Sequence, residues 1–305
     1  MIDKEELSAL IKQRATELGF TACGIARAEE VATSVRKEFE AWIASEAHGT
    51  MSYMAGNLEK RMNPTLLVEG CKSIVVVAQN YYPEKSTPHI SRYAQGKDYH
   101  RVVKDKLYRL LQYIDSLTPT TGRAFCDSAP VLERYWAVQA GIGWCGKNRQ
   151  LIIPHTGTHI FLGELLIDTE LSYDTPFEKN HCGNCNACID SCPTGALSPT
   201  GIDARRCLSY KTIEYRGELS DDIGTLLQEC FYGCDRCQKA CPHNKFATPT
   251  EEKAFAVSEQ LLAMQPQEWR NLTREQFDKL FTDSAVQRCG YRQLMRNIEA
   301  SNIKP

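Results

Sequence analysis

Cysteines dominate the part of this sequence that could carry out chemistry. Nine of the 14 cysteines lie between Cys182 and Cys241. Residues 182–193 have the spacing Cys-x2-Cys-x2-Cys-x3-Cys-Pro, and residues 234–242 repeat the last three cysteines and the proline, with Phe231 in the place of the first cysteine. In loops with this spacing, three thiolates hold one 4Fe–4S cluster and the fourth cysteine reaches a second cluster. The sequence therefore predicts two clusters.

The same two-cluster logic distributes the thiols. One cluster receives Cys182, Cys185, Cys188 and Cys241. The other receives Cys192, Cys234, Cys237 and one further ligand, which is either Cys207 or Cys230. Structural zinc is the alternative, but it prefers two separated cysteine pairs around one tetrahedral ion. Two neighbouring clusters would form an electron relay, which needs an acceptor elsewhere in the chain.

Two features before the cysteines are candidates for that acceptor site. The glycine-rich segment 141–148, GIGWCGKN, could hold a phosphate or carboxamide edge through its backbone and Lys147, or it could be a plain turn. Asp127 follows an expected strand, so it either lines a ligand site or caps a helix expected to start near Pro130. We interpret Cys23, Cys71 and Cys126 as buried packing residues.

Hydrophobic periodicity defines the elements that must position these residues. Asp3 and Glu6 have capping-box spacing, which predicts a helix over 3–18. Further helices are expected around 35–43 and 103–114, and from Pro130 onward. Strands are expected over 20–25, 73–79 and 123–126, with a strand pair around 151–153 and 158–167, and the 73–79 strand should be buried on both faces.

This pattern predicts an α+β chain of three parts. Residues 1–171 form an α/β-like catalytic domain, and residues 172–250 form a bacterial-ferredoxin-like module that metal centres hold together. Helical stripes return over 251–305 and are expected to cover both parts.

Composition narrows the classes of function. Lys and Arg number 36 against 38 Asp and Glu, so nucleic-acid binding would need a local basic patch. No stretch approaches the 18 or so apolar residues of a membrane span, and the N-terminus lacks the pattern of an export signal. We therefore expect a cytoplasmic protein without membrane contact, acting as a monomer. Fourteen cysteines in a reducing compartment then indicate metal or redox chemistry.

Several unrelated motifs occur together in one order. They are Arg61-x2-Pro64, SRYA at 91–94, DSAPVLER at 127–134, GIGWCGKN at 141–148, the cysteine run at 182–193, RRCLSY at 205–210 and GCDRC at 233–237. In this combination the chain resembles epoxyqueuosine reductases. The resemblance implies a cobalamin-dependent oxidoreductase with two 4Fe–4S clusters, which reduces epoxyqueuosine to queuosine at the wobble position of tRNA. It also implies an N-terminal domain similar to the reductive dehalogenase core.

The resemblance also assigns roles to single residues. It implies that Cys207 completes the second cluster, with Cys230 as the other candidate. Asp127 would donate a proton to the leaving epoxide oxygen. The resemblance implies that cobalamin binds base-off, and the sequence is compatible with this, since a lower-ligand Asp-x-His-x-x-Gly motif fails at Val103. The expected cobalamin contacts are Arg61, Tyr93, Asp127, Lys147, Asn148 and Ser209.

The expected partners are tRNA and a low-potential electron donor. Two basic patches are candidates for the tRNA contact, namely Lys97, Arg101, Lys104, Lys106 and Arg109, and Arg205, Arg206, Lys211 and Arg216. The first patch could instead be a solvated helix face. Two other functions stay open from the residues, a dehalogenase-like cobalamin and iron–sulfur reductase of a small molecule, and a ferredoxin-type electron carrier.

Overall fold

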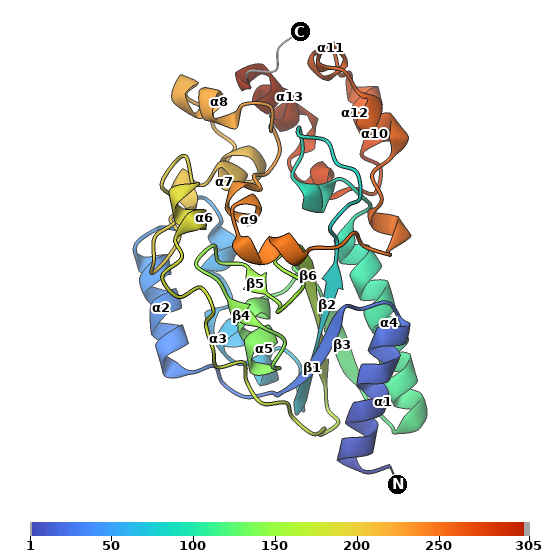
Figure 1. The fold of residues 1–305 in the computed structure, drawn as a ribbon. Helices are drawn as coiled ribbons and strands as arrows, with labels where there is room; N and C mark the ends of the chain where they lie inside the picture. The colour runs from blue at the N-terminus through green and yellow to red at the C-terminus, as the bar shows by residue number, and fades with distance from the viewer. Residues whose placement is uncertain (1, 302–305) are drawn as a thin grey trace.

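A four-stranded sheet forms the centre of the N-terminal half in the computed structural model, which describes residues 2–301 (Figure 1). Its strands are β1 (Ala22–Arg27), β2 (Ser73–Asn80), β3 (Gly122–Phe125) and β6 (Ile160–Ile167), in the order β1-β2-β6-β3. Every neighbouring pair is antiparallel. The expected α+β class is therefore confirmed, with antiparallel strands in its sheet.

Helices cover both faces of this sheet, which is why its central strands are mostly apolar. One face carries α1 (Lys4–Glu17) and α4 (Tyr99–Leu117), and the other is covered by α5 (Glu133–Gln139). Seven of the eight residues of β2 are buried, as predicted for the 73–79 strand. Antiparallel strands usually leave one face to solvent, so the run of β-branched residues predicts burial but not strand direction.

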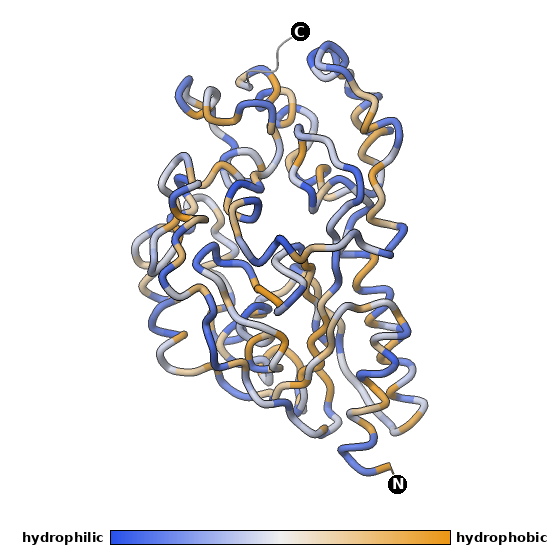
Figure 2. Tube along the Cα trace, viewed as in Figure 1, coloured by the Kyte–Doolittle hydropathy of each residue, from blue (hydrophilic) through white to orange (hydrophobic). Residues whose placement is uncertain are grey.

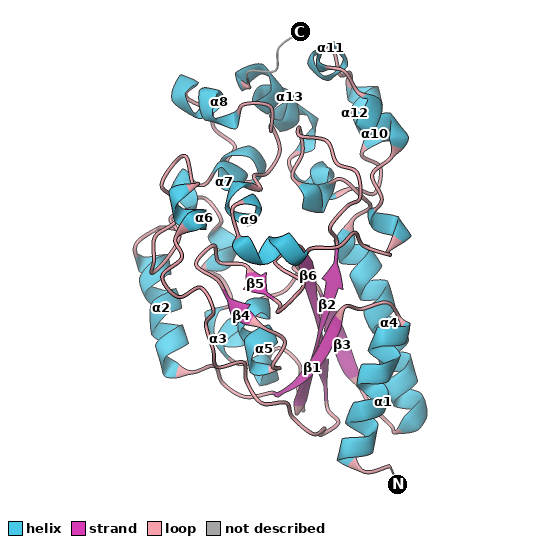
Figure 3. Cartoon of the chain, viewed as in Figure 1, coloured by secondary structure: helices cyan, strands magenta, loops and turns pink. Residues whose placement is uncertain are grey.

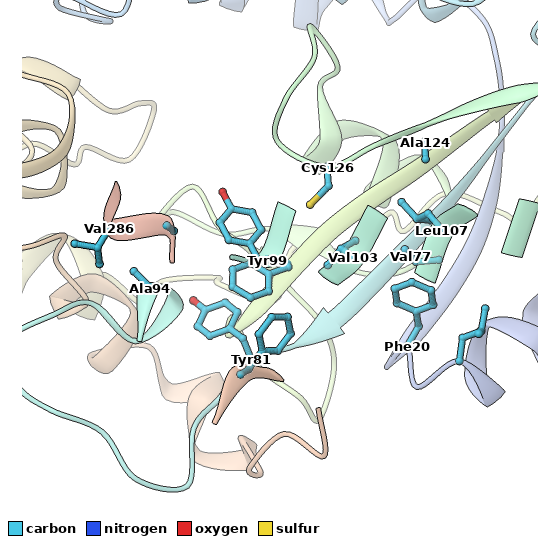
Figure 4. Packing of buried hydrophobic residues seen from close by; sticks show 14 of the residues in the cluster. Phe20, Val77, Tyr81, Ala94, Tyr99, Val103, Leu107, Ala124, Cys126 and Val286 are labelled. Atoms are coloured by element: carbon cyan, nitrogen blue, oxygen red, sulfur yellow. The ribbon is translucent and has the colours of Figure 1, made fainter. Parts of the chain in front are cut away.

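Local signals place the first helices accurately. The Asp3 carboxylate accepts the Glu6 N–H at 2.8 Å at the start of α1, which confirms the predicted helix. Along α4, Tyr99, Val103 and Leu107 face the sheet beside Val77 (Figure 4). Hydrophobic residues gather along the sheet strands in Figure 2. The remaining helices of this half are α2 (Thr33–Ala44) and α3 (Leu58–Met62).

The predicted pairing of 151–153 with 158–167 is wrong. β5 (Leu151–Ile152) pairs instead with β4 (Trp144–Cys145) in a separate hairpin, while β6 lies in the main sheet. A single bridge between Ile153 and Gly157 is all that joins the two segments. The glycine-rich segment forms this hairpin because a Cβ at Gly143 would lie 2.2 Å from the Ile152 carbonyl oxygen.

Short helices separated by loops make up the cysteine-rich segment (Figure 3). They are α6 (Ala187–Asp190), α7 (Leu208–Ile213), α8 (Asp221–Leu227) and α9 (Arg236–Lys239). The C-terminal helices are α10 (Glu259–Ala263), α11 (Pro266–Arg270), α12 (Arg274–Leu280) and α13 (Gly290–Ala300). Short 3-10 helices cover 52–54, 64–66, 92–94, 204–206, 242–246, 253–255 and 285–288.

One hydrophobic cluster runs from the N-terminal helix to the C-terminal helices. It joins Ile11 and Leu107 of the sheet domain with Phe231 of the cysteine-rich segment and Phe277 and Leu294 of the last helices. The boundaries at residues 171 and 250 thus mark changes of composition along the chain. That they also separate domains stays a prediction. Within 2–301, no helix is long and apolar enough to cross a lipid bilayer.

Candidate functional site

The first group of cysteines comes from both motifs. Cys182, Cys185 and Cys188 line one cavity together with Cys241, which follows 53 residues after Cys188 in the sequence. Burial raises the pKa of the Cys188 and Cys241 thiols, and the neighbouring thiols of the group raise it further. The fold thus assembles the four cysteines that the two-cluster logic assigns to one cluster.

The second group is likewise assembled from separate segments. Burial raises the pKa of Cys237, and the nearby thiols of Cys234, Cys207 and Cys192 raise it further. Cys207 interacts electrostatically with Cys192 and with Cys234 as well. The other candidate, Cys230, interacts electrostatically with Cys234, and its thiol donates to the carbonyl oxygens of Tyr232 and Gly233 at 3.5 and 3.7 Å.

The donor set suits clusters better than a single ion. In the described part of the chain, no three His, Cys, Asp or Glu side chains lie close enough together to hold one metal ion. Four thiols around one cavity are the donor set of a cube, in which each iron takes one thiolate at its own corner. A tetrahedral zinc ion needs all four sulfurs within about 2.3 Å of one centre.

Lys147 and Asn148 lie beside the first cysteine group. The Lys147 ammonium donates to the carbonyl oxygens of Gly183 and Cys185 at 2.9 and 3.0 Å, and to the Asn186 side chain at 2.9 Å. Asn148 is 3% exposed and lines the cavity of this group, yet its side-chain NH2 has no partner among the described residues. The segment 141–148 thus contains β4, and its lysine holds the first cysteine loop through three hydrogen bonds.

Asp127 lies where β3 ends and faces the first turn of α4. Its carboxylate accepts the Tyr99 hydroxyl at 2.5 Å, and the His100 Nε2 atom lies 3.8 Å away. His100 Nδ1 in turn lies 2.7 Å from the Asp98 carboxylate. The Asp127 side chain is 63% exposed, so it remains accessible to a ligand.

The alternative interpretation of Asp127 as a helix cap is wrong. The helix expected from Pro130 begins at Glu133, and its N-cap is Leu132. Asp127 itself has a φ of +49°, in the left-handed region, and its backbone N–H donates to Glu133 Oε1 at 2.5 Å. Sequence reasoning missed Tyr99, His100 and Glu133 as site residues. Tyr99 and His100 lie in DYH at 98–100, which begins the incomplete lower-ligand motif, and Glu133 lies in the family motif DSAPVLER at 127–134.

The other expected cobalamin contacts lie apart from Lys147. Arg61 is 7% exposed and donates to the Tyr53 carbonyl oxygen at 3.1 Å, while its buried Nε has no partner within residues 2–301. The Tyr93 hydroxyl lies 3.3 Å from that of Tyr232, and Ser209 lies in α7 immediately after Cys207 and Leu208. An unpaired guanidinium nitrogen in a buried position suits a polar cofactor edge, so Arg61 fits the expectation.

Much of the expected basic surface is already paired. Lys106 forms ion pairs and hydrogen bonds with Glu252 and Gln79, and Arg101 pairs with Asp283. In the second patch, Arg205 binds Asp203 through two nitrogens at 2.9 Å, and Arg216 donates to the Cys289 carbonyl oxygen at 2.7 Å. These four side chains hold the fold together, and a nucleic acid would have to compete for them.

Comparison with protein families identifies two matching regions. Residues 61–128 match the model described as epoxyqueuosine reductase QueG, DUF1730, and residues 181–244 match the 4Fe-4S double cluster binding domain. The first match includes Arg61, Tyr93 and Asp127, and the second includes both cysteine motifs.

Similar proteins extend the match to almost the whole chain. An epoxyqueuosine reductase of Cellulophaga algicola is 42% identical over 308 residues, covering 98% of this chain and 99% of that protein. The Escherichia coli epoxyqueuosine reductase is 37% identical over 309 residues, covering 97% and 81%.

Solved structures show the same fold. An epoxyqueuosine reductase crystallised with an epoxyqueuosine-modified tRNA-Tyr stem loop matches with a TM-score of 0.86 and 27% identity, over 97% of this chain and 80% of that one. The catabolic reductive dehalogenase NpRdhA matches with a TM-score of 0.50 and 18% identity, over 97% and 38%. The expected likeness to the reductive dehalogenase fold is thus confirmed at the level of fold.

Proposed function

This chain belongs to the epoxyqueuosine reductase family, and on that premise we propose that it reduces epoxyqueuosine to queuosine at the wobble position of tRNA. The proposal rests mainly on the way the two cysteine motifs share their thiols. Each motif contributes cysteines to both groups, which gives two adjacent sites of four thiols each. Two clusters passing single electrons suit a reaction that consumes two electrons and two protons and releases the epoxide oxygen as water.

Cobalamin is the second cofactor in this proposal. When bound, it would supply a metal centre that collects two electrons for one reduction. Arg61 is the best supported contact, because its buried Nε lacks a partner in the described chain. Tyr93, Ser209 and Asp127 follow from the family resemblance. Lys147 and Asn148 stay predicted contacts, although both lie beside the first cysteine group.

Asp127 is the proposed proton donor. Its carboxyl group is exposed at the end of β3, and Tyr99 holds it by a hydrogen bond of 2.5 Å. His100 lies between Asp127 and Asp98, so it can return a proton to Asp127 after each turnover. The expected electron donor, the monomeric state and action in the cytoplasm, where tRNA is modified, complete the proposal.

Reconstitution with a defined substrate tests the function. The protein is loaded anaerobically with iron, sulfide and cobalamin, and is given an anticodon stem loop that carries epoxyqueuosine. We expect mass spectrometry to show the loss of one oxygen atom. A protein that takes up eight irons per chain but no corrinoid would instead be an electron carrier, and a loaded protein that leaves the stem loop unchanged would have another substrate.

Substitution of Asp127 tests its role. Asp127→Asn keeps the shape but removes the acid, so turnover should fall roughly 10²–10⁴-fold, the usual contribution of a general acid. Iron content and cobalamin uptake should stay at the parent level. Asp105→Asn, an exposed change on α4, is the matched control. Turnover of Asp127→Asn within about threefold of the parent would place the acid elsewhere.

A further inference from the structure

A buried acidic residue lies beneath the Asp127 loop. Glu164 belongs to β6, where it pairs with Phe125 of β3, and its side chain is fully buried. Its strand neighbours Leu162 and Leu166 face the apolar cluster beneath α5, together with Trp136 and Ala137. An isolated carboxylate in such surroundings is very unfavourable, so this group needs either a partner or a proton.

Glu133 is the partner of Glu164. Both carboxyl oxygens of Glu164 lack an N–H or O–H donor from any residue in 2–301, and the group with which Glu164 shares a side-chain hydrogen bond is the carboxyl of Glu133. Two carboxylates cannot hydrogen-bond to each other unless a proton lies between them. Two buried carboxyl groups that interact in this way are therefore expected to hold at least one proton in the folded protein.

The pair also makes contact with the loop that carries Asp127. Glu133 Oε1 accepts the Asp127 N–H at 2.5 Å, and this bond holds a backbone with a φ of +49°, which a non-glycine residue adopts only when its surroundings enforce it. In a related epoxyqueuosine reductase from Bacillus subtilis, the aspartate-bearing catalytic loop has been seen swung out of the active site. A device that holds this loop in place is therefore useful to the reaction.

We propose that Glu133 and Glu164 form a proton-sharing carboxyl pair that positions Asp127 for catalysis. Glu164 holds the proton and donates it to Glu133, and Glu133 uses its other oxygen to hold the Asp127 N–H. Both are positioning residues, and the proposal rests on the assignment of Asp127 as the acid.

The electrostatic surroundings favour the protonated pair. Burial raises the pKa of Glu133 to about 8, with Asp127 as the next cause, and burial together with Glu133 raises the pKa of Glu164 well above its usual range. The other ionisable groups that influence the pair are the Cys126 thiol and Arg134. The Asp127 N–H, Arg134 and the Glu164 side chain favour ionisation of Glu133. One exposed arginine does not offset the burial of two acids.

The pair predicts a pH dependence of stability that needs no substrate. In the unfolded chain both acids ionise near pH 4.5, whereas the folded protein keeps at least one proton to higher pH. The stability that the pair contributes is thus complete below about pH 4.5 and decreases as the pH rises through the raised pKa values of the two acids, of which that of Glu133 is about 8. In Glu164→Gln the amide N–H donates to Glu133 in place of the shared proton. The pH dependence of the free energy of unfolding should therefore correspond to about one proton fewer than in the parent protein.

The experiment compares three variants of the cluster- and cobalamin-loaded protein. Thermal unfolding is measured between pH 5 and pH 8, and the infrared C=O band of a protonated carboxylic acid is recorded without substrate. Glu164→Gln should remove that band, flatten the pH dependence and keep turnover within about twofold. Glu164→Leu leaves Glu133 without a donor, so turnover should fall about tenfold or more. Asp168→Asn, just beyond β6, is the control and should change neither the band nor turnover.

Two results would contradict the proposal of a shared proton. They are an acid band that survives in Glu164→Gln and a pH dependence equal to that of the parent, and either would show that Glu164 does not hold the proton. Equal losses of turnover in Glu164→Gln and Glu164→Leu would show that the donated hydrogen bond does not position Asp127. These results concern the pair alone, since the Asp127→Asn variant tests the proposed function separately.

Discussion

At the scale of single residues, Lys147 shows how one side chain can organise a metal-binding loop. Its ammonium group has three donors, and three acceptors of the first cysteine loop surround it at 2.9 to 3.0 Å. Two of them are the backbone carbonyls of Gly183 and Cys185, which lie within the first cysteine motif. The contact therefore fixes the loop path before the thiols bind iron, and it adds a positive charge beside a cluster that carries negative thiolates.

Lys147→Met tests this contact. The substitution keeps the aliphatic stem and removes all three hydrogen bonds, so the loop should bind its cluster more weakly. We expect iron content after gel filtration to fall from about eight atoms per chain toward four, with the second cluster retained. The exposed Lys179, three residues before Cys182, provides the control variant Lys179→Met. Full iron content in Lys147→Met would mean that the thiols alone define the loop.

At the scale of elements, the close contact between β1 and α5 sets the position of the Asp127 loop. A Cβ at Gly24 would lie 2.1 Å from the Ala140 carbonyl oxygen at the end of α5, so only glycine allows the helix to approach the strand this closely. The first residue of α5 is Glu133, which holds the Asp127 N–H. A shift at one end of this seven-residue helix therefore moves the catalytic loop at the other.

Gly24→Ala should consequently affect both stability and turnover. The added methyl group meets backbone, which cannot rotate away, so we expect the free energy of unfolding to fall by about 1–3 kcal/mol. Turnover should fall in the same variant while cobalamin and iron remain bound. The matched control is Gly56→Ala, whose Cβ would have the Tyr53 carbonyl oxygen at 3.7 Å as its nearest neighbour. If the two variants have equal stability, β1 and α5 do not pack as closely as described.

At the scale of the whole molecule, α13 links the C-terminal helices to the second cysteine group. Asn297 is fully buried, and its side-chain NH2 donates to the carbonyl oxygens of Thr212 in α7 and of Phe231, each at 2.9 Å. Cys207 directly precedes α7, and Cys234 follows Phe231 by three residues. One amide therefore joins the two segments that bring separate thiols to the second cluster.

Asn297→Leu removes both of these hydrogen bonds and leaves the Phe231 carbonyl without a donor, whereas the Thr212 carbonyl keeps the Gln293 side chain as a donor. We expect a loss of about 1–3 kcal/mol in the free energy of unfolding, together with a selective loss of the second cluster. Chemical denaturation and iron analysis measure the two effects. Glu299→Ala, an exposed change on the same helix, should alter neither. A stable Asn297→Leu protein with both clusters would show that α13 covers the module without supporting it.

Local patterns were sufficient for much of this chain. The amphipathic stripes of 3–18 and 103–114 placed α1 and α4, and the apolar run at 73–79 placed β2. The cysteine spacing predicted how two motifs would exchange ligands, because three thiols on one tight loop leave the fourth pointing away. The helix and strand predictions succeed because they depend on residues close in the sequence, and the ligand exchange stays a prediction. The role of Asp127 and its cobalamin neighbours came from family resemblance, and it stays a prediction.

Features that join distant parts of the sequence could be seen only in the tertiary structure. Strand direction, the β4–β5 pairing and the position of Glu164 against Glu133 all depend on residues far apart in the sequence. A buried glutamate in an apolar strand looks like an interruption of the hydrophobic pattern until its partner is known. The last ligand of the second cluster poses a similar question, because Cys207 and Cys230 have equal local chemistry and both interact with Cys234 in the fold, and Cys207 stays the predicted ligand.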